Sequence, residues 1–172
     1  RHLGMNVGRV EKHWVKNCLA VGLSQGFIEP LEATALHIVQ ETLQGFIDAW
    51  ELGGFTNINQ EKFNTRINNR FEGVRDYIVA HYVCNSCDDT DYWRANRQHD
   101  VLSDNLKSVI ETWVSNGDLA RVLKERNMDK YYLPMSWYAL LSGYGIFPSL
   151  LPTTVFNPAE ESLRAETLAN EE

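Results

Sequence analysis

The clearest pattern in the chain is an apolar stripe with helical spacing in its second quarter. Apolar side chains recur every three or four residues, while Arg66, Arg70 and Arg75 lie largely off the stripe. Such spacing puts the apolar residues on one face of an α-helix. The stripe consists of Phe63, Ile67, Phe71, Val74 and Ile78. We therefore predict a helix that is capped by Asn59 and ends near Tyr82.

A second helical pattern precedes this stripe. Pro30 suits a first helical turn, where its missing N–H has no helical acceptor in any case. Glu29 and Glu32 carry the negative charge that the start of a helix favours, and Gly53-Gly54 is a stop signal. The apolar positions with helical spacing are Leu31, Ala35, Ile38, Val39, Leu43, Phe46, Ile47 and Trp50. A helix is therefore expected from Glu29-Pro30 to the glycine pair.

The first 28 residues have a different pattern. Residues 7–10 are short and β-like, and residues 14–15 and 18–21 follow as a second, apolar extended stretch. Gly22, Ser24 and Gly26 then interrupt the chain as turn residues. We predict one or two strands that end in a glycine-rich loop. Isolated hairpins are marginal in water, so strands without a sheet are a sign that the chain is a piece of a longer protein.

Shorter helices are predicted in the rest of the chain. Their signals are Tyr92 and Trp93 in one helix, a cap at Ser103 or Asp104 in the next, a start at Asp118, and an aromatic segment over 134–141. The fold class is therefore mainly α. Its expected parts are a β remnant over 1–28, a helical bundle over 29–148, and an irregular tail with a last helix over 149–172.

Composition and charge narrow the function. The 172 residues carry 16 Lys and Arg against 23 Asp and Glu, a net charge of −7. This balance argues against nucleic acid and anionic membranes as partners, and no apolar run is long enough to span a bilayer. Three cysteines do not form a disulfide framework, which favours the reducing cytoplasm. Because Arg1 rather than Met comes first, we expect a piece of a longer protein.

One possible metal site is weak. Cys84 and Cys87 form a CxxC, and His81 and His99 lie nearby in sequence, which together could make a four-ligand zinc site. A CxxC without a second pair is a weak signal. The alternative is that the two cysteines close a helix and start a loop, and we predict no metal.

The densest chemistry lies between Gly22 and Ala35. A glycine-rich loop there leads into a helix start, where backbone N–H groups lack helical acceptors and bind anions. The small side chains of Ala33 and Ala35 would let a ligand approach these amides, and Glu32 lies one turn in. The alternative is an ordinary strand-to-helix connection with a solvated Glu32.

Four segments carry a family resemblance. They are NCLAVGLS with GFIEPLEAT over 17–34, RDYIVAHY over 75–82, DDTDYW over 88–93 and SWYALLSGYG over 136–145. In this order they resemble segments of the flavin-dependent tryptophan halogenases, and the similarity runs from about Val7 to Pro148. The resemblance implies an enzyme that uses reduced FAD, oxygen and chloride or bromide to halogenate an indole or another electron-rich aromatic. A separate flavin reductase would supply the reduced FAD.

The same resemblance implies that only part of such an enzyme is present. The chain contains neither a GxGxxG after a strand nor a WxWxIP motif, and none of its lysines matches the family's catalytic lysine. We therefore expect the C-terminal portion of a halogenase, with residues 1–28 as the edge of its flavin-binding domain. It would be inactive alone and would need the N-terminal part of the same protein.

The resemblance also assigns roles to individual residues. The carboxylate of Glu32 would be catalytic, because it can stabilise a cationic intermediate or act as a base. The other matched positions are Gly22, Ser24 and Gly26 for the flavin, the amides of Thr34 and Ala35 for the halide, and Trp137 and Tyr138 for the substrate. Trp137 departs from the family pattern. Its indole N–H cannot reproduce the hydrogen bonds of a phenol, which argues against free tryptophan as substrate.

Three readings of the residues stay open. Core packing is the alternative for Trp137 and Tyr138. A flavin monooxygenase that hydroxylates its aromatic substrate is an alternative for the whole protein, and a helical protein-binding module is another. Products that depend on halide would separate the halogenase from the monooxygenase, whereas intact activity of the whole protein after Glu32→Gln would favour the binding module.

Overall fold

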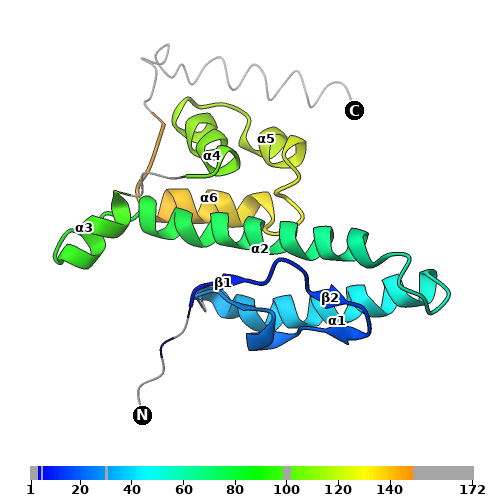
Figure 1. Ribbon diagram of the computed structural model, residues 1–172. Coiled ribbons are helices and arrows are strands. Elements are labelled where there is room, and N and C mark those ends of the chain that lie inside the picture. Colours follow the sequence, from blue (N-terminus) through cyan, green and yellow to red (C-terminus); the bar gives the residue numbers. More distant parts are fainter. Residues whose placement is uncertain (1–3, 5, 30, 99–101, 149–172) are drawn as a thin grey trace, which may run out of the picture.

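The computed structural model describes residues 4, 6–29, 31–98 and 102–148, and of Glu32 it describes the backbone only. A long central helix, α2, separates two layers (Figure 1). On one side lie α1 and the short strands, and on the other lie α4, α5 and α6. The helices are α1 Thr34–Leu52, α2 Gln60–Val83, α3 Asp91–Arg97, α4 Asp104–Val114, α5 Leu119–Glu125 and α6 Pro134–Gly143.

The predicted stripe on α2 is confirmed. All five of its residues are buried, in a core that also contains Trp14 from the N-terminal strands and Ile38 from α1. The ring of Trp14 meets Phe46 and Phe63 edge-on, at centroid distances of 5.0 and 5.8 Å. This core attaches α1 and the strands to the first two-thirds of α2.

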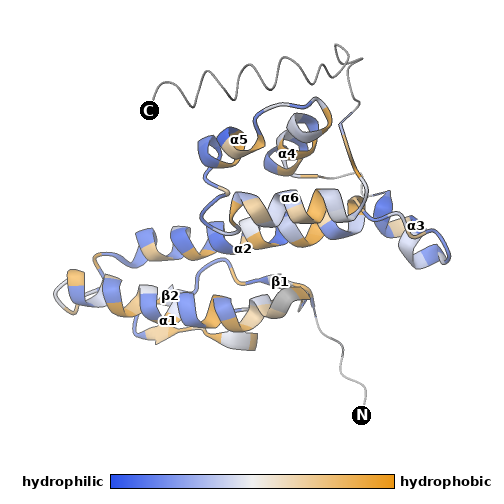
Figure 2. Cartoon of the chain, turned by 180° about the vertical axis from the view of Figure 1, so that it is seen from behind, coloured by the Kyte–Doolittle hydropathy of each residue, from blue (hydrophilic) through white to orange (hydrophobic). Residues whose placement is uncertain are grey.

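A second core lies against the other face of α2. Tyr77, Ala80 and Cys84, which are not part of the stripe, are buried against α4, α5 and α6. The partners include Leu106, Val109, Leu119, Leu123, Trp137 and Leu141. Figure 2 shows hydrophobic residues along α6 and the part of α2 beside it. Because α2 is covered on two faces here, it carries a second set of buried residues in addition to the stripe.

The N-terminal strands form two small antiparallel pairs. β1 (Gly8–Arg9) pairs with β4 (Gly26–Phe27), and β2 (Trp14–Val15) pairs with β3 (Cys18–Leu19). The predicted loop is therefore shorter than expected, because Gly26 belongs to a strand. A Cβ on Gly26 would lie 2.7 Å from the carbonyl oxygen of Gly8. Only glycine allows β1 and β4 to approach this closely.

The predicted helix starts at Ser103 and Asp118 are confirmed. The Ser103 hydroxyl accepts from the N–H of Leu106, and the Asp118 carboxylate accepts from the N–H of Arg121. Asn59 precedes α2 as predicted, but its side chain makes no cap. Its Nδ2 instead donates to the carbonyl of Ala49, 3.0 Å away, and so links α2 to α1. The predicted tail and last helix over 149–172 lie outside the described residues.

Gly73 is expected to be irreplaceable in the middle of α2. A Cβ at this position would lie 2.0 Å from the ring of Tyr131, which also holds the Arg70 guanidinium 5.4 Å from its centroid. We expect Gly73→Ala to lower the free energy of unfolding by about 1–3 kcal/mol, because overpacking outweighs alanine's helix propensity of about 1 kcal/mol. Urea denaturation measures this change. A more stable variant would contradict the close packing of Tyr131 on α2.

The described helices do not include a membrane span, since none of them is both long and apolar enough to cross a bilayer.

Candidate functional site

The glycine-rich loop folds into a tight turn rather than an open loop. Gly22–Ser24 form a single 3-10 turn, η1, which starts at Gly22 with a φ of 64°. The Ser24 hydroxyl accepts from the N–H of Val21 at 3.1 Å and donates to the Val21 carbonyl at 2.9 Å. The side chain of Ser24 therefore stabilises the turn, and Gly22 and Gly26 leave the backbone at their own positions without a Cβ.

The helix after the loop begins later than predicted. Leu31–Ala33 form a separate 3-10 turn, η2, and α1 starts only at Thr34. The break lies at Ala33, whose left-handed conformation (φ 55°, ψ 24°) is not helical. The buried Thr34 donates its hydroxyl to the carbonyl of Leu31 and so stabilises this sharp entry into the helix. The N–H of Ala35 consequently lies in the first turn of α1, where helical acceptors are absent.

The strained Ala33 yields a stability prediction. A left-handed conformation costs an L-residue roughly 1–2 kcal/mol that glycine does not incur. The stabilisation expected from glycine is partly offset, because glycine also gives the unfolded chain more conformational freedom. We expect Ala33→Gly to leave stability unchanged or to raise it by up to about 1 kcal/mol, and Ala35→Gly, inside α1, to lower it by a similar amount. Thermal unfolding of the two variants measures the contrast, and equal destabilisation would contradict the conformation of Ala33.

A cavity of about 220 Å³ brings three predicted site residues together. Gly22, Gly26 and Ala35 all line it, and its deeper wall contains the apolar side chains of Ile38 and Phe71. Ser24 lines a neighbouring depression that also contains Gly26. The start of α1 at Ala35 thus lies beside an apolar space. Apolar surroundings screen charge poorly, so an anion at a helix start in such a place would be attracted more strongly than in water.

Glu32 lies in the turn that joins the loop to α1. Its backbone belongs to η2, between Leu31 and Ala33, directly before Thr34. The chain therefore keeps the predicted neighbourhood of Glu32 with the amides of Thr34 and Ala35. Burial and the nearby Glu29, three residues before Glu32, raise the pKa of Tyr82 at the end of α2.

The two predicted substrate residues lie in the other core. Trp137 and Tyr138 belong to α6, on the opposite side of α2 from the cavity. Trp137 is 1 % exposed, and its ring meets Tyr77 edge-on at 4.9 Å. Its Nε1 is buried and has no acceptor among the described residues. Tyr138 is half-buried against Trp113. The structure therefore does not bring this pair to the loop and the helix start.

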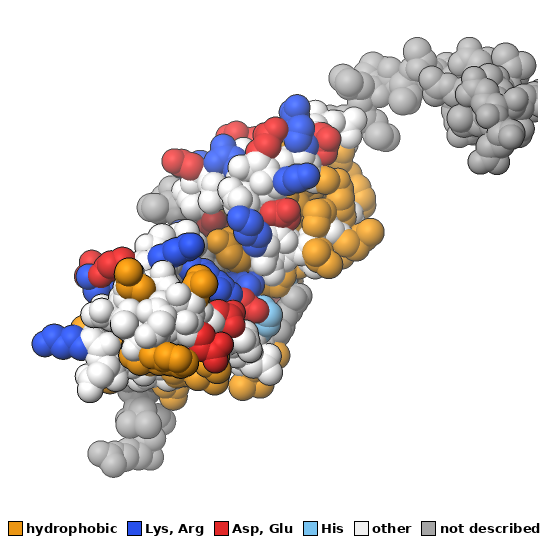
Figure 3. Space-filling view, turned by 90° about the vertical axis from the view of Figure 1, so that its right-hand side faces the viewer, with side chains coloured by type: hydrophobic (Ala, Val, Ile, Leu, Met, Phe, Trp, Pro, Cys, Tyr) orange, Lys and Arg blue, Asp and Glu red, His pale blue; other side chains and the backbone are white. Residues whose placement is uncertain are grey.

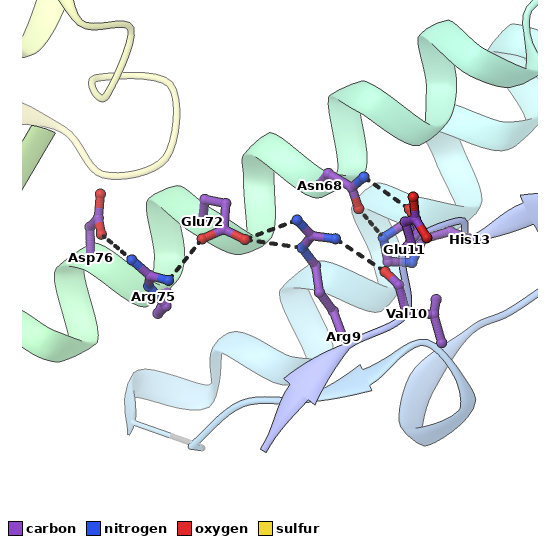
Figure 4. A network of polar contacts seen from close by, with 8 residues as sticks. All are labelled: Arg9, Val10, Glu11, His13, Asn68, Glu72, Arg75 and Asp76. Atoms are coloured by element: carbon purple, nitrogen blue, oxygen red, sulfur yellow. Dashed lines mark hydrogen bonds and ion pairs between the residues drawn. The ribbon is translucent and has the colours of Figure 1, made fainter. Parts of the chain in front are cut away.

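A chain of polar contacts that the sequence analysis missed connects β1 to α2 (Figure 4). Arg9 of β1 binds Glu72 of α2 through two nitrogens, at 3.1 and 3.0 Å, and Glu72 also pairs with Arg75 at 3.2 Å. Arg75 in turn lies 3.6 Å from Asp76. Burial raises the pKa of Asp76, although a hydrogen bond from Ser103 opposes this. Arg9 follows a glycine in an ordinary short strand, so the sequence offers no local signal for its partner.

Gln25 is a second residue that the sequence analysis missed. It is buried and lines the cavity beside Gly22 and Gly26. Its amide nitrogen donates to the hydroxyl of Thr42 on α1. The one sequence signal for Gln25 was its long polar side chain within a glycine-rich turn.

The described residues contain no group of three or more His, Cys, Asp and Glu side chains able to hold a metal. His99 of the considered zinc set lies outside the described residues. Cys84 is buried, and burial raises the pKa of its thiol to about 11. Cys18 and Cys87 are exposed, and all three cysteines are free.

The candidate site is therefore a turn with two glycines, Gly22 and Gly26, that lies with the start of α1 around an apolar cavity. The family model for tryptophan halogenases matches residues 1–157. The chain therefore belongs to the tryptophan halogenase family. It is 32% identical over 147 residues to tryptophan 6-halogenase SttH of Streptomyces toxytricini, covering 84% of this chain and 27% of that protein.

Other comparisons agree. The chain is 28% identical over 152 residues to tryptophan 7-halogenase RebH of Lentzea aerocolonigenes, which covers 83% of this chain and 28% of that protein. Among solved structures, BrvH, a flavin-dependent halogenase from Brevundimonas sp. BAL3, superposes with a TM-score of 0.73 at 30% identity. That match covers 99% of this chain and 33% of the other. The chain thus spans about a third or less of the relatives that it matches.

Proposed function

We propose that the chain is the C-terminal part of a flavin-dependent halogenase. The whole protein would use reduced FAD, oxygen and chloride or bromide to halogenate an indole or another electron-rich aromatic. The observation that carries this proposal is the cavity shared by Gly22, Gly26 and Ala35, with Glu32 in the turn beside it. FAD, when bound, would supply the oxidising chemistry, and the chain's own residues would hold the halide and handle charge and protons.

The halide would be bound by backbone rather than by side chains. The hydroxyl of Thr34 is already donated to the Leu31 carbonyl, so the donors toward an anion would be the amides of Thr34 and Ala35. Amides bind anions whatever side chain they carry. The alanine at position 35 is therefore compatible with the site, and its small Cβ leaves the cavity open.

Glu32 would act on the reacting aromatic ring. Substitution of hydrogen by halogen passes through a positively charged ring and then releases a proton. A carboxylate close to that ring stabilises the charge and accepts the proton. Glu32 lies two residues before Thr34. This position supports the role, because the carboxylate and the amides that bind the halide would lie within one turn of the chain.

The flavin would lie against the turn Gly22–Ser24 and Gly26. A planar ring can approach the backbone closely where glycines carry no Cβ. The tightness of η1, closed by the Ser24 hydroxyl, supports a rigid platform. The rest of the cofactor would be held by the N-terminal part of the same protein.

Trp137 and Tyr138 would contact the aromatic substrate. The support is the buried Nε1 of Trp137, which lacks an acceptor among the residues described. Leaving a buried donor unpaired is costly, and an acceptor atom on a bound substrate would remove that cost. Since an indole N–H only donates, the substrate is proposed to be an aromatic other than free tryptophan.

The remaining partners would be a flavin reductase and the N-terminal part of the same protein. Leu23, Leu36, Leu43 and Ile47 are exposed hydrophobic residues around the cavity and along α1, and Figure 3 shows patches of hydrophobic side chains on one face between mixed charges. Such residues would be covered by the flavin-binding part. The three free cysteines and the acidic charge support a cytoplasmic protein without nucleic acid or membrane partners.

An assay of the whole protein tests this function. Purified protein, FAD, a flavin reductase, NADH and oxygen are incubated with a panel of indoles and phenols, with and without chloride or bromide, and products are identified by mass spectrometry. We expect halogenated product only when halide is present. Hydroxylated product regardless of halide would instead establish the monooxygenase alternative. Halogenation by the 172 residues alone would overturn the claim that this part is inactive.

A further inference from the structure

Gln25 has an unusual environment for a residue in a surface turn. It is 1 % exposed, whereas its neighbours Leu23 and Ser24 are exposed. Its Nε2 donates to Oγ1 of Thr42, 2.6 Å away, and Thr42 is fully buried in the middle of α1. A buried hydrogen bond between two side chains therefore connects the glycine-rich turn to the helix that starts at Thr34.

The backbone of Gln25 makes two further connections. Its N–H donates to the carbonyl of Gly22 at 2.9 Å, which closes η1, and its carbonyl accepts from the N–H of Val10 at 3.0 Å. One residue thus joins the turn, the end of β1 and, through Thr42, helix α1.

The turn is also held from the side of α2. In β1, Arg9 lies opposite Gly26 in the strand pair and forms its two-point contact with Glu72 (Figure 4). The missing Cβ of Gly26 allows the close approach of β1 and β4, because a Cβ there would lie 2.7 Å from the carbonyl oxygen of Gly8. The only adjustable connection from the turn to α1 among these contacts is the bond between Gln25 and Thr42.

We propose that Gln25 is a positioning residue, which through Thr42 sets the distance between the turn Gly22–Gly26 and the first turn of α1. The inference rests on the proposed function, in which the flavin contacts the turn Gly22–Gly26 and the halide binds at the first turn of α1. Because Gln25, Gly22, Gly26 and Ala35 line one cavity, movement of the turn changes the shape of the halide site. Small displacements of reacting groups have large effects on rate and binding.

The test compares the unmodified whole protein with four single variants and one double variant. Thr42→Val keeps the volume of the side chain but removes the acceptor of the Gln25 amide, while Thr42→Ser keeps the hydroxyl. Gln25→Met removes the donor at similar length. Thr112→Val is the matched control, because the Thr112 hydroxyl bonds only within α4, to the carbonyl of Ser108, at 2.6 Å.

We expect Thr42→Val and Gln25→Met each to raise the KM for halide about tenfold, with a smaller effect on kcat. Thr42→Ser and Thr112→Val should stay close to the unmodified protein. The double variant Gln25→Met with Thr42→Val should be no worse than either single variant, as expected for one shared interaction. An unchanged halide KM in both single variants, with halogenation intact in the unmodified protein, would overturn the inference.

Amide hydrogen exchange separates this outcome from failure of the proposed function. If the unmodified protein does not halogenate, the halogenase proposal fails, but exchange at residues 22–26 still reports the anchoring. We expect faster exchange there in Thr42→Val than in Thr42→Ser and Thr112→Val. Equal exchange rates in all three would show that the pair does not position the turn.

Discussion

Replacing Glu32 with glutamine is expected to reduce kcat for halogenation by the whole protein about 100-fold or more, the range of a lost general base or charge stabiliser. Glutamine keeps the size of the side chain but can neither accept the ring proton nor balance a positive charge. The KM for halide should change little, because the proposed halide donors are the amides of Thr34 and Ala35, which the substitution leaves in place.

Glu29→Gln is the matched control for this experiment. It removes a charge three residues earlier, and Glu29 interacts with Tyr82 rather than with the start of α1. Steady-state rates of halogenated product, with circular dichroism to verify folding, compare the two variants. A Glu32→Gln protein with the unmodified rate would remove Glu32 from the chemistry and favour a helical binding module.

Replacing Trp14 with alanine is expected to lower the free energy of unfolding by about 3–5 kcal/mol, as for other large-to-small changes in a core. Trp14 is 1 % exposed, and its ring packs edge-on against Phe46, Trp50 and Phe63. Its Nε1 also donates to the carbonyl of Lys16 at 2.9 Å. The change would leave a large cavity where the strands, α1 and α2 meet.

Urea denaturation of the 172-residue chain measures this effect. Trp14→Phe keeps most of the ring and should cost less than the alanine variant. Tyr92→Ala is the control for loss of an aromatic side chain, because Tyr92 is 55 % exposed on α3, and we expect it to cost below about 1 kcal/mol. Similar losses for Trp14→Ala and Tyr92→Ala would contradict the central place of Trp14 in this core.

Local signals in the sequence were sufficient to predict α2 and the starts of α4 and α5. The stripe from Phe63 to Ile78 predicted α2 because every third or fourth residue had to be apolar on the face toward α1. Ser103 and Asp118 predicted helix starts because a capping side chain bonds an N–H only a few residues away. In both cases the residues that give the signal lie within one or two helical turns of the structure that they predict.

Contacts between distant residues were not predictable in this way. The second buried face of α2, with Tyr77 and Ala80, became visible only once α4 and α6 were packed against it. The pairing of Gly26 with Arg9 turned an expected loop residue into part of a strand. The left-handed Ala33 delayed the start of α1 by several residues, although Pro30 and the acidic residues around it suggested an earlier one.

The candidate site was likewise predictable from the sequence only in part. The sequence by itself determined the family and the order of the segment from Gly22 to Ala35, because motifs and helix starts depend on neighbouring residues. Only the tertiary structure decided that Gly22, Gly26 and Ala35 share a cavity while Trp137 lies across α2, and that Gln25 connects the turn to Thr42. These arrangements depend on which faces of the helices pack together, and a buried polar group takes the partner that this packing brings within reach.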